Sequence, residues 1–181
     1  MFKSIFAVSV TLLILSSTVL ASTRCNPFTV TGSYVRQSTD GYGTGTLYID
    51  QLRLDVDGGA YWFSSASFDY FLQGPFIPTI GSWTCLADGT VLVTAIGSQY
   101  ASNAGDINVS SNFRSTLKLS VVDNNTLELT YSIITTIPLS NNPLGSGTAA
   151  GCTPSGGTGA FVSPCAPGPY KRILPQVNDI P

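Results

Sequence analysis

Hydrophobic and polar residues alternate along much of the chain, a pattern typical of strands that bury one face. The clearest case is residues 113–136, where two alternating runs flank the turn-forming sequence Asp123-Asn124-Asn125. These turn residues tolerate the tight backbone of a hairpin. The sequence therefore predicts two antiparallel strands here. Their expected core-facing residues are Leu117, Leu119, Val121, Leu127, Leu129, Tyr131 and Ile133.

The same layout of strand, turn and strand occurs twice upstream. The turns are Asp57-Gly58-Gly59 and Asp88-Gly89, each followed by a second apolar run. No segment after the N-terminal region carries an apolar stripe of helical period. We predict an all-β fold, an antiparallel up-and-down meander of seven to eight strands that curls into a closed or nearly closed barrel. The expected strands are about 28–36, 45–56, 60–68, 82–87, 90–98, 113–122 and 126–136, with a further short strand near 69–73.

The two ends of the chain differ from this central region. Residues 1–21 have the form of a signal peptide, with Lys3, an apolar run from Phe6 to Leu15, and a small residue, Ala21, at the cleavage position. That run is too short for a stable membrane span. We expect a soluble, secreted barrel domain over 22–137 and an irregular tail rich in Gly, Pro and Ser over 138–181. Its last stretch, Tyr170 to Pro175, either docks onto the barrel or frays.

The four cysteines, Cys25, Cys85, Cys152 and Cys165, predict two disulfides in an exported chain. Loop length favours pairing Cys152 with Cys165, which leaves Cys25 for Cys85. The alternative joins Cys85 to a tail cysteine and holds the tail over the barrel. The spacing lacks the paired pattern of a zinc site, and we expect no metal.

Composition narrows the classes of partner. Charged residues make up 10% of the chain, the net charge is −2, and there is no run of basic residues. These features argue against binding to nucleic acid or to anionic membranes. Asn108-Val109-Ser110 and Asn124-Asn125-Thr126 are glycosylation sequons if the source is eukaryotic. No cofactor motif is present.

Histidine is absent, which excludes Ser-His-Asp and Cys-His nucleophiles and leaves Cys85 without an activating base. Asp55-Val56-Asp57-Gly58 matches a fragment of a calcium loop, but Arg53 and Ser64 stand where further ligands are needed. We interpret the fragment as a hairpin turn. An enzyme that uses carboxylates or tyrosines on a barrel is one functional hypothesis, ranked below the two that are given at the end of this section.

Aromatic residues gather between 61 and 76, beside the turn-rich segment Phe68 to Pro78. They either fill the core and one outer stripe, or they line and cover a ligand cavity, since such cavities are mostly apolar with few polar anchors. For the second case we predict that the segment is a lid and that Arg114 is a polar anchor. The predicted aromatic pocket contacts are Tyr61, Phe63, Trp83 and Tyr131.

Gly32-Ser33-Tyr34, preceded by Phe28, resembles the Gly-x-aromatic element in the first strand of lipocalins, the calycin group. Phe68-Asp69-Tyr70 is the nearest counterpart of a later Thr-Asp-Tyr element, and no counterpart of the lipocalin arginine element is found. The resemblance covers about 28–136 by architecture and implies a barrel with a small apolar ligand.

The leading hypothesis is therefore a secreted binding module for a small hydrophobic or amphipathic ligand. The alternative is a structural or adhesive surface protein that associates with itself, which the low charge and the Ser, Thr, Asn and Gly content suit.

Overall fold

The computed structural model describes residues 24–39, 47–64, 79–100, 108–153, 156–158 and 168–175. The predicted signal peptide and the predicted lid at 68–78 lie outside these residues. One short helix, α1 (Pro27–Val30), precedes the strands. The strands are β1 (Gly32–Thr39), β2 (Leu47–Leu54), β3 (Gly59–Ser64), β4 (Thr79–Cys85), β5 (Val91–Tyr100), β6 (Val109–Asp123), β7 (Thr126–Pro138), β8 (Thr148–Thr153), β9 (Gly156–Thr158) and β10 (Tyr170–Arg172).

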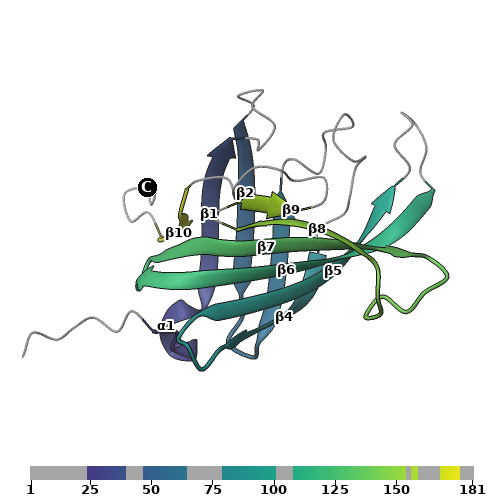
Figure 1. Ribbon diagram of the computed structural model, residues 1–181. Helices are drawn as coiled ribbons and strands as arrows, with labels where there is room; N and C mark the ends of the chain where they lie inside the picture. Colours follow the sequence, from purple (N-terminus) through teal and green to yellow (C-terminus); the bar gives the residue numbers. More distant parts are fainter. Residues whose placement is uncertain are drawn as a thin grey trace, which may run out of the picture.

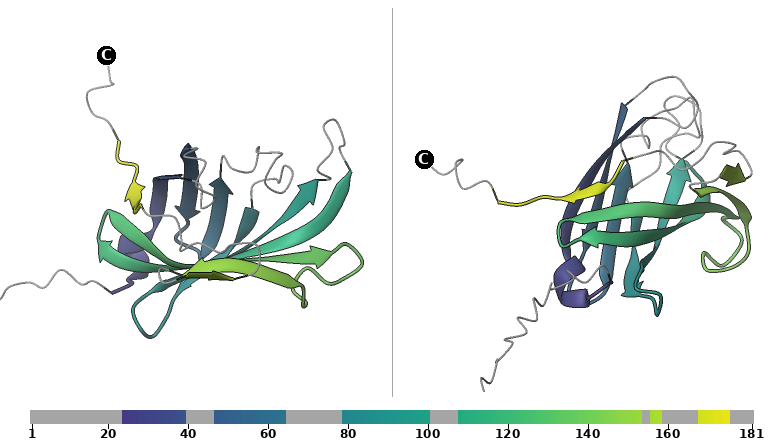
Figure 2. Two further views of the ribbon diagram at one scale, coloured as in Figure 1. Left: turned by 45° about the horizontal axis from the view of Figure 1, so that its top comes forward. Right: turned by 60° about the vertical axis from the view of Figure 1, so that its left-hand side comes forward.

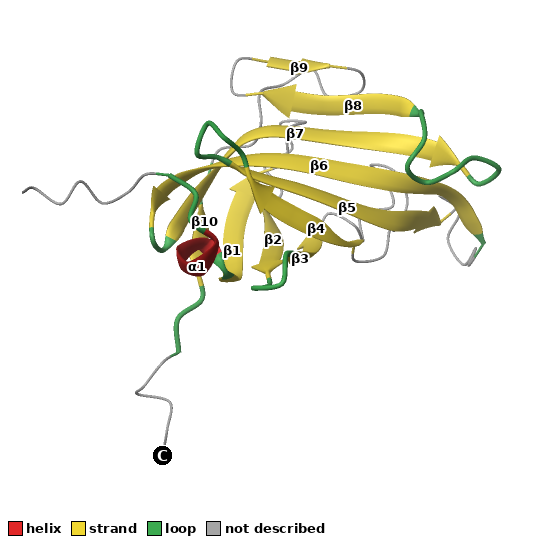
Figure 3. Cartoon of the chain, turned by 90° about the horizontal axis from the view of Figure 1, so that it is seen from below, coloured by secondary structure: helices red, strands yellow, loops and turns green. Residues whose placement is uncertain are grey.

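Eight of these strands form a closed antiparallel barrel (Figure 1). β1 to β7 pair in chain order, and β10 lies between β1 and β7, pairing with both. The predicted all-β meander and its closure are confirmed. β8 pairs with a later part of β7 and β9 pairs with β8, so these two strands extend the sheet beyond the ring (Figure 3).

Three aspartate turns shape one end of the barrel, which we call the hairpin end. The side chains of Asp57, Asp88 and Asp123 each accept a hydrogen bond from the backbone N–H two residues later, at 3.0, 3.0 and 2.7 Å. Gly58 and Gly89 have φ values of +87° and +84°, which favour glycine. The turns expected from sequence are therefore present. β1, β3 and β5 finish at the opposite end, the loop end.

A β-bulge in the β6–β7 hairpin changes which side chains of β7 point into the barrel. Leu119 pairs with Leu129 but Lys118 pairs with Tyr131, which leaves Thr130 as an extra residue. Such an insertion turns the following side chains to the other face of the sheet. Before the bulge, Leu127 and Leu129 face the interior. Beyond it, Tyr131 and Ile133 share the outer face with their β6 partners, so the expected continuous core face on β7 is wrong.

The C-terminal region is more regular than predicted. Residues 138–181 contain β8, β9 and β10 rather than only irregular chain. Tyr170 to Arg172 docks back onto the barrel, which is the first of the two alternatives raised by the sequence. The barrel therefore needs residues beyond 137 to close.

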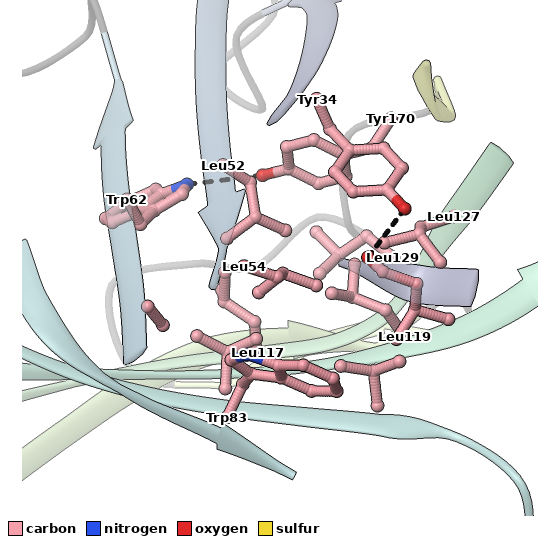
Figure 4. Close-up of a cluster of buried hydrophobic side chains, with 14 of the residues drawn as sticks. Tyr34, Leu52, Leu54, Trp62, Trp83, Leu117, Leu119, Leu127, Leu129 and Tyr170 are labelled. Carbon is pink, nitrogen blue, oxygen red and sulfur yellow. Dashed lines mark hydrogen bonds between the residues drawn. The ribbon is translucent and has the colours of Figure 1, made fainter. Parts of the chain in front are cut away.

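The apolar core fills the hairpin end, where β1–β3 cross the direction of β5–β7 (Figure 2). Its polar atoms are paired. The indole N–H of Trp62 donates to the Tyr170 hydroxyl at 3.2 Å, that of Trp83 donates to the Asp55 carbonyl at 2.8 Å, and the Tyr34 hydroxyl donates to the Val30 carbonyl at 2.7 Å. The larger core side chains, drawn in Figure 4, are Tyr34, Leu52, Leu54, Trp62, Trp83, Leu117, Leu119, Leu127, Leu129 and Tyr170.

A disulfide joins Cys25, just before α1, to Cys85 at the end of β4. This is the pairing that loop length favoured. The Cys25 N–H also donates to the Gly89 carbonyl at 2.6 Å, so α1 is tied to the β4–β5 turn. Cys152 is disulfide-bonded as well, while Cys165 lies outside the described residues.

Candidate functional site

A buried ion pair lies inside the barrel on its first two strands. Arg36 of β1 and Asp50 of β2 are cross-strand partners, and the Arg36 Nε donates to Asp50 Oδ2 at 2.8 Å. The Nη2 of Arg36 donates to the same oxygen. The two residues are 8% and 2% exposed, and no other charged residue in the described ranges is buried. Buried charges are stable only when paired, and this pair satisfies that rule.

Tyr170 covers Arg36 from the closing strand. The guanidinium carbon lies 4.9 Å from the centre of the Tyr170 ring, within the range of a cation–π contact. Burial lowers the pKa of Arg36, but Tyr170 and Asp50 together raise that pKa above its ordinary value. Burial likewise raises the pKa of Tyr170. Arg36 therefore stays charged and Tyr170 stays neutral at physiological pH.

Further hydroxyl groups are buried on β3, β4 and β6. Ser64 of β3 is the cross-strand partner of Asp50, and Thr79 donates its hydroxyl to the Trp62 carbonyl at 2.9 Å. Ser115 lies between Phe113 and Leu117 on the inward face of β6 and is 1% exposed. Its Oγ has no hydrogen-bond partner in the described part of the chain. A buried hydroxyl without a hydrogen-bond partner is uncommon in folded proteins.

The structure does not bring the five predicted pocket residues together. Trp83 faces the interior, within the apolar core. Tyr61 and Phe63 face outward beside their β2 partners, on the face opposite Trp62.

The remaining two also lie outside the barrel. Tyr131 is placed on the outer face by the bulge, beside Lys118. Arg114 lies on the outer face of β6, between the inward Phe113 and Ser115, and its Nη1 donates to the Gly145 carbonyl at 3.2 Å. Arg114 therefore contacts the β7–β8 connection rather than the interior.

Both predicted glycosylation positions are on the surface. Asn108 precedes β6 and Asn124 lies in the β6–β7 turn, and both residues are exposed. Asp55 and Asp57 shape the β2–β3 turn, as interpreted from the sequence: Gly58 N–H donates to the Asp55 carbonyl at 3.0 Å.

The sequence reasoning missed Arg36, Asp50 and Ser115. A signal was available, because Arg36 follows Tyr34 at the core-facing spacing and Asp50 precedes Leu52 and Leu54 in the same way. A basic and an acidic residue at core-facing positions of two consecutive strands predict a buried ion pair. Ser115 stands in the same phase as Leu117, but a serine there carries a much weaker signal.

Arg172 forms a second polar contact, at the hairpin end. Its guanidinium carbon lies 5.3 Å from the centre of the Tyr34 ring, and its Nη2 donates to the Tyr34 hydroxyl at 2.7 Å and to the Thr29 carbonyl. Burial raises the pKa of Tyr34, although Arg172 opposes this shift. Arg172 thus joins α1, β1 and β10. No arginine with such a role was identified from the sequence.

Fold and site together define a closed antiparallel β-barrel with a disulfide between Cys25 and Cys85, an apolar core at the hairpin end and a buried ion pair inside the ring. No protein-family model matches the chain, and neither a curated protein nor a solved structure matches it significantly. In the part of the chain that the structure describes, no helix is long and apolar enough to cross a membrane. The disulfide is consistent with an oxidising compartment.

Proposed function

We propose that this chain is a secreted, lipocalin-like barrel that binds a small amphipathic molecule inside the barrel. The observation that carries the proposal is Ser115, an interior hydroxyl that is buried and lacks a partner in the described residues. It lies on the same inward face as core residues. Small-molecule sites are lined mostly by apolar side chains, with a few polar groups that orient the ligand, and Ser115 could serve as such a group.

The calycin part of the proposal rests on Tyr34 and Arg172. Gly32-Ser33-Tyr34 is the Gly-x-aromatic element of the first strand, and Arg172 supplies the arginine that lies against its aromatic ring. These two elements lie together at the end of the barrel next to α1. Their contact supports a lipocalin-like relationship beyond strand order alone.

Ligand binding is tested by fluorescence and mass. Trp62 and Trp83 are both 7% exposed in the core, so a ligand inside the barrel should quench their emission. We expect saturable quenching by retinol or by a long-chain alcohol, and a ligand mass retained in native mass spectrometry. Ile80→Ala on the outer face is the control and should bind equally. Absence of saturable quenching with every probe would refute the proposal.

A second candidate function, assembly with copies of itself at a surface, is favoured by the outer face. Tyr61 and Ile80 are direct cross-strand partners and are 39% and 71% exposed. Paired apolar residues exposed on a sheet can mark a protein contact. Analytical ultracentrifugation distinguishes the two functions, because self-association that Ile80→Lys abolishes without any ligand would favour assembly.

A further inference from the structure

We propose that the groove between β1 and β7 also accepts β10 from a second copy of this chain, so that two copies exchange β10 and each strand closes the ring of the other copy. The proposal depends neither on ligand binding nor on the exposed outer face. It follows from the contacts that hold β10 in the ring and from the edges that β10 covers.

The first observation is that both edges of β10 are paired. Lys171 lies opposite Val35 of β1 on one edge and opposite Thr126 of β7 on the other. The Ile173 N–H extends the first edge by donating to the Ser33 carbonyl at 2.8 Å. Such backbone bonds require only an extended segment in the correct register. The groove between β1 and β7 is therefore a strand-binding site.

The second observation is that two side chains of β10 fix its register. Tyr170 is fully buried, and its hydroxyl accepts the indole N–H of Trp62 at 3.2 Å. Arg172 lies over the ring of the buried Tyr34, and its Nη2 donates to the Tyr34 hydroxyl at 2.7 Å. Lys171, between these two residues, is exposed. Because a shift by one residue would turn Lys171 inward and both anchors outward, the groove selects the order Tyr-x-Arg.

The third observation is that these contacts are the same whichever chain supplies β10. They join β10 to α1, β1, β3 and β7, whereas β8 and β9, which precede β10 in the chain, pair with β7 and with each other. A second copy offers the same segment in the same register. Mutual exchange leaves two complete rings and covers the edges of β1 and β7 in both copies. We therefore assign a second copy as the partner that this groove fits.

Concentration decides between the two sources of β10. β9 ends at Thr158 and β10 begins at Tyr170, so eleven residues, 159–169, separate them. A short connection gives the chain's own strand an effective concentration on the order of 1 mM. Chains that refold together at about 1 mM should therefore exchange β10 in roughly half of all cases, and in about one in a hundred at about 0.01 mM.

A pair of introduced cysteines traps the exchanged dimer. Val35→Cys is made in one chain and Lys171→Cys in another, because these two residues are cross-strand partners. A disulfide between positions 35 and 171 of different chains then reports β10 of one copy paired with β1 of the other. The two variants are mixed in urea with their native disulfides intact, refolded at the two concentrations and oxidised. Mass spectrometry of the non-reduced peptides measures the bond.

The matched control combines Val35→Cys with Lys118→Cys, since Lys118 lies on β6, which does not pair with β1. We expect the bond between positions 35 and 171 to increase with concentration and to exceed the control bond at least about tenfold at the higher concentration. Both substitutions in one chain, refolded at the lower concentration, give the reference yield within a ring. A yield between chains that does not exceed the control would overturn the proposal.

A second version of the trap places Ser33→Cys and Ile173→Cys in separate chains, at the residues joined by the backbone bond on the same edge. Absence of a bond between chains with both pairs would overturn the proposal. Ile80→Lys, added to either pair, separates exchange from assembly through the outer face. It should leave the yield unchanged, and a loss of yield would assign the contact to the outer face instead. Retinol quenching tests ligand binding independently of these results.

Discussion

Arg172 holds three elements together through one side chain. It contacts the Tyr34 ring on β1, donates to the Thr29 carbonyl at α1, and belongs to the strand that closes the ring. Its backbone N–H also donates to the Asn125 carbonyl at 2.8 Å. A residue with so many contacts to separate elements should contribute more to stability than other surface-accessible arginines.

We therefore predict that Arg172→Met lowers the free energy of unfolding by about 1–3 kcal/mol, because two hydrogen bonds and a ring contact are lost. Urea unfolding followed by tryptophan fluorescence measures the change. Arg53→Met is the control: the Arg53–Asp55 pair is exposed, with side chains 64% and 42% accessible, and should contribute less than about 0.5 kcal/mol. Equal losses in the two variants would contradict this assignment.

Asp88 should make stability depend on acid pH. The Lys118 ammonium donates to its carboxylate at 2.7 Å, and this bond, followed by those from Thr90, lowers the pKa of Asp88. A carboxyl group whose pKa is lower in the folded state contributes stability above its unfolded pKa, about 3.9, and loses it as the pH falls further. We expect Lys118→Met to reduce the stability difference between pH 7 and pH 2, measured by urea midpoints. An unchanged difference would exclude this linkage.

Among the elements, β7 has two faces that exchange roles at Thr130. Leu129 before the bulge is buried in the core, whereas Tyr131 after it is half-buried on the outer face. We predict that Leu129→Ala costs about 2–4 kcal/mol of unfolding free energy, because it leaves a cavity. Tyr131→Ala should cost about 1 kcal/mol or less. Chemical denaturation measures both losses. A larger loss for Tyr131→Ala than for Leu129→Ala would contradict a bulge at Thr130.

The disulfide fixes α1 and the N-terminal segment to the β4–β5 turn. Cys25 and Cys85 are 60 residues apart, so the bond restricts the unfolded chain considerably. Cys25→Ser/Cys85→Ser should lower the free energy of unfolding by about 2–5 kcal/mol and leave ligand binding of the folded protein intact. Thermal and urea unfolding measure the stability, and retinol quenching measures the binding. Loss of binding at unchanged stability would assign the disulfide a direct functional role.

The elements that the sequence predicted are those governed by local chemistry. Asp57, Asp88 and Asp123 bond to backbone groups two residues away, so their turns are visible in a short window. The bulge at Thr130 depends on pairing with β6, and β10 depends on partners far away in the chain. The burial of Arg36 and Asp50 could have been predicted from the alternation of core-facing positions along their strands. Which residues contact them depends on closure of the whole ring.

At the scale of the whole molecule, closure depends on one three-residue strand. β10 pairs through two residues with β1 and through two with β7, and Tyr170 within it is fully buried. A chain ending after residue 167 would leave β1 and β7 with open edges, which favour pairing between molecules. We predict that this truncated chain forms oligomers, and that size exclusion with light scattering gives its particles a larger mass than those of the untruncated chain.

A chain ending after Pro175 is the matched control for that truncation, because it keeps β10 whole. It should have the same oligomeric state as the untruncated chain. If the chain ending after residue 167 also kept that state, the closing strand would not protect the edges.

The position of β10 in the chain has a consequence for the order of folding. Each of the three aspartate hairpins joins neighbouring segments, but the contact between Tyr34 and Arg172 spans 138 residues. Contacts of such long range form slowly, and this one requires β10, which is synthesised after the other strands of the ring. The ring should therefore close in a late, separate step. Pulsed hydrogen exchange should show amides of the β4–β7 hairpins protected before those of β1 that face β10.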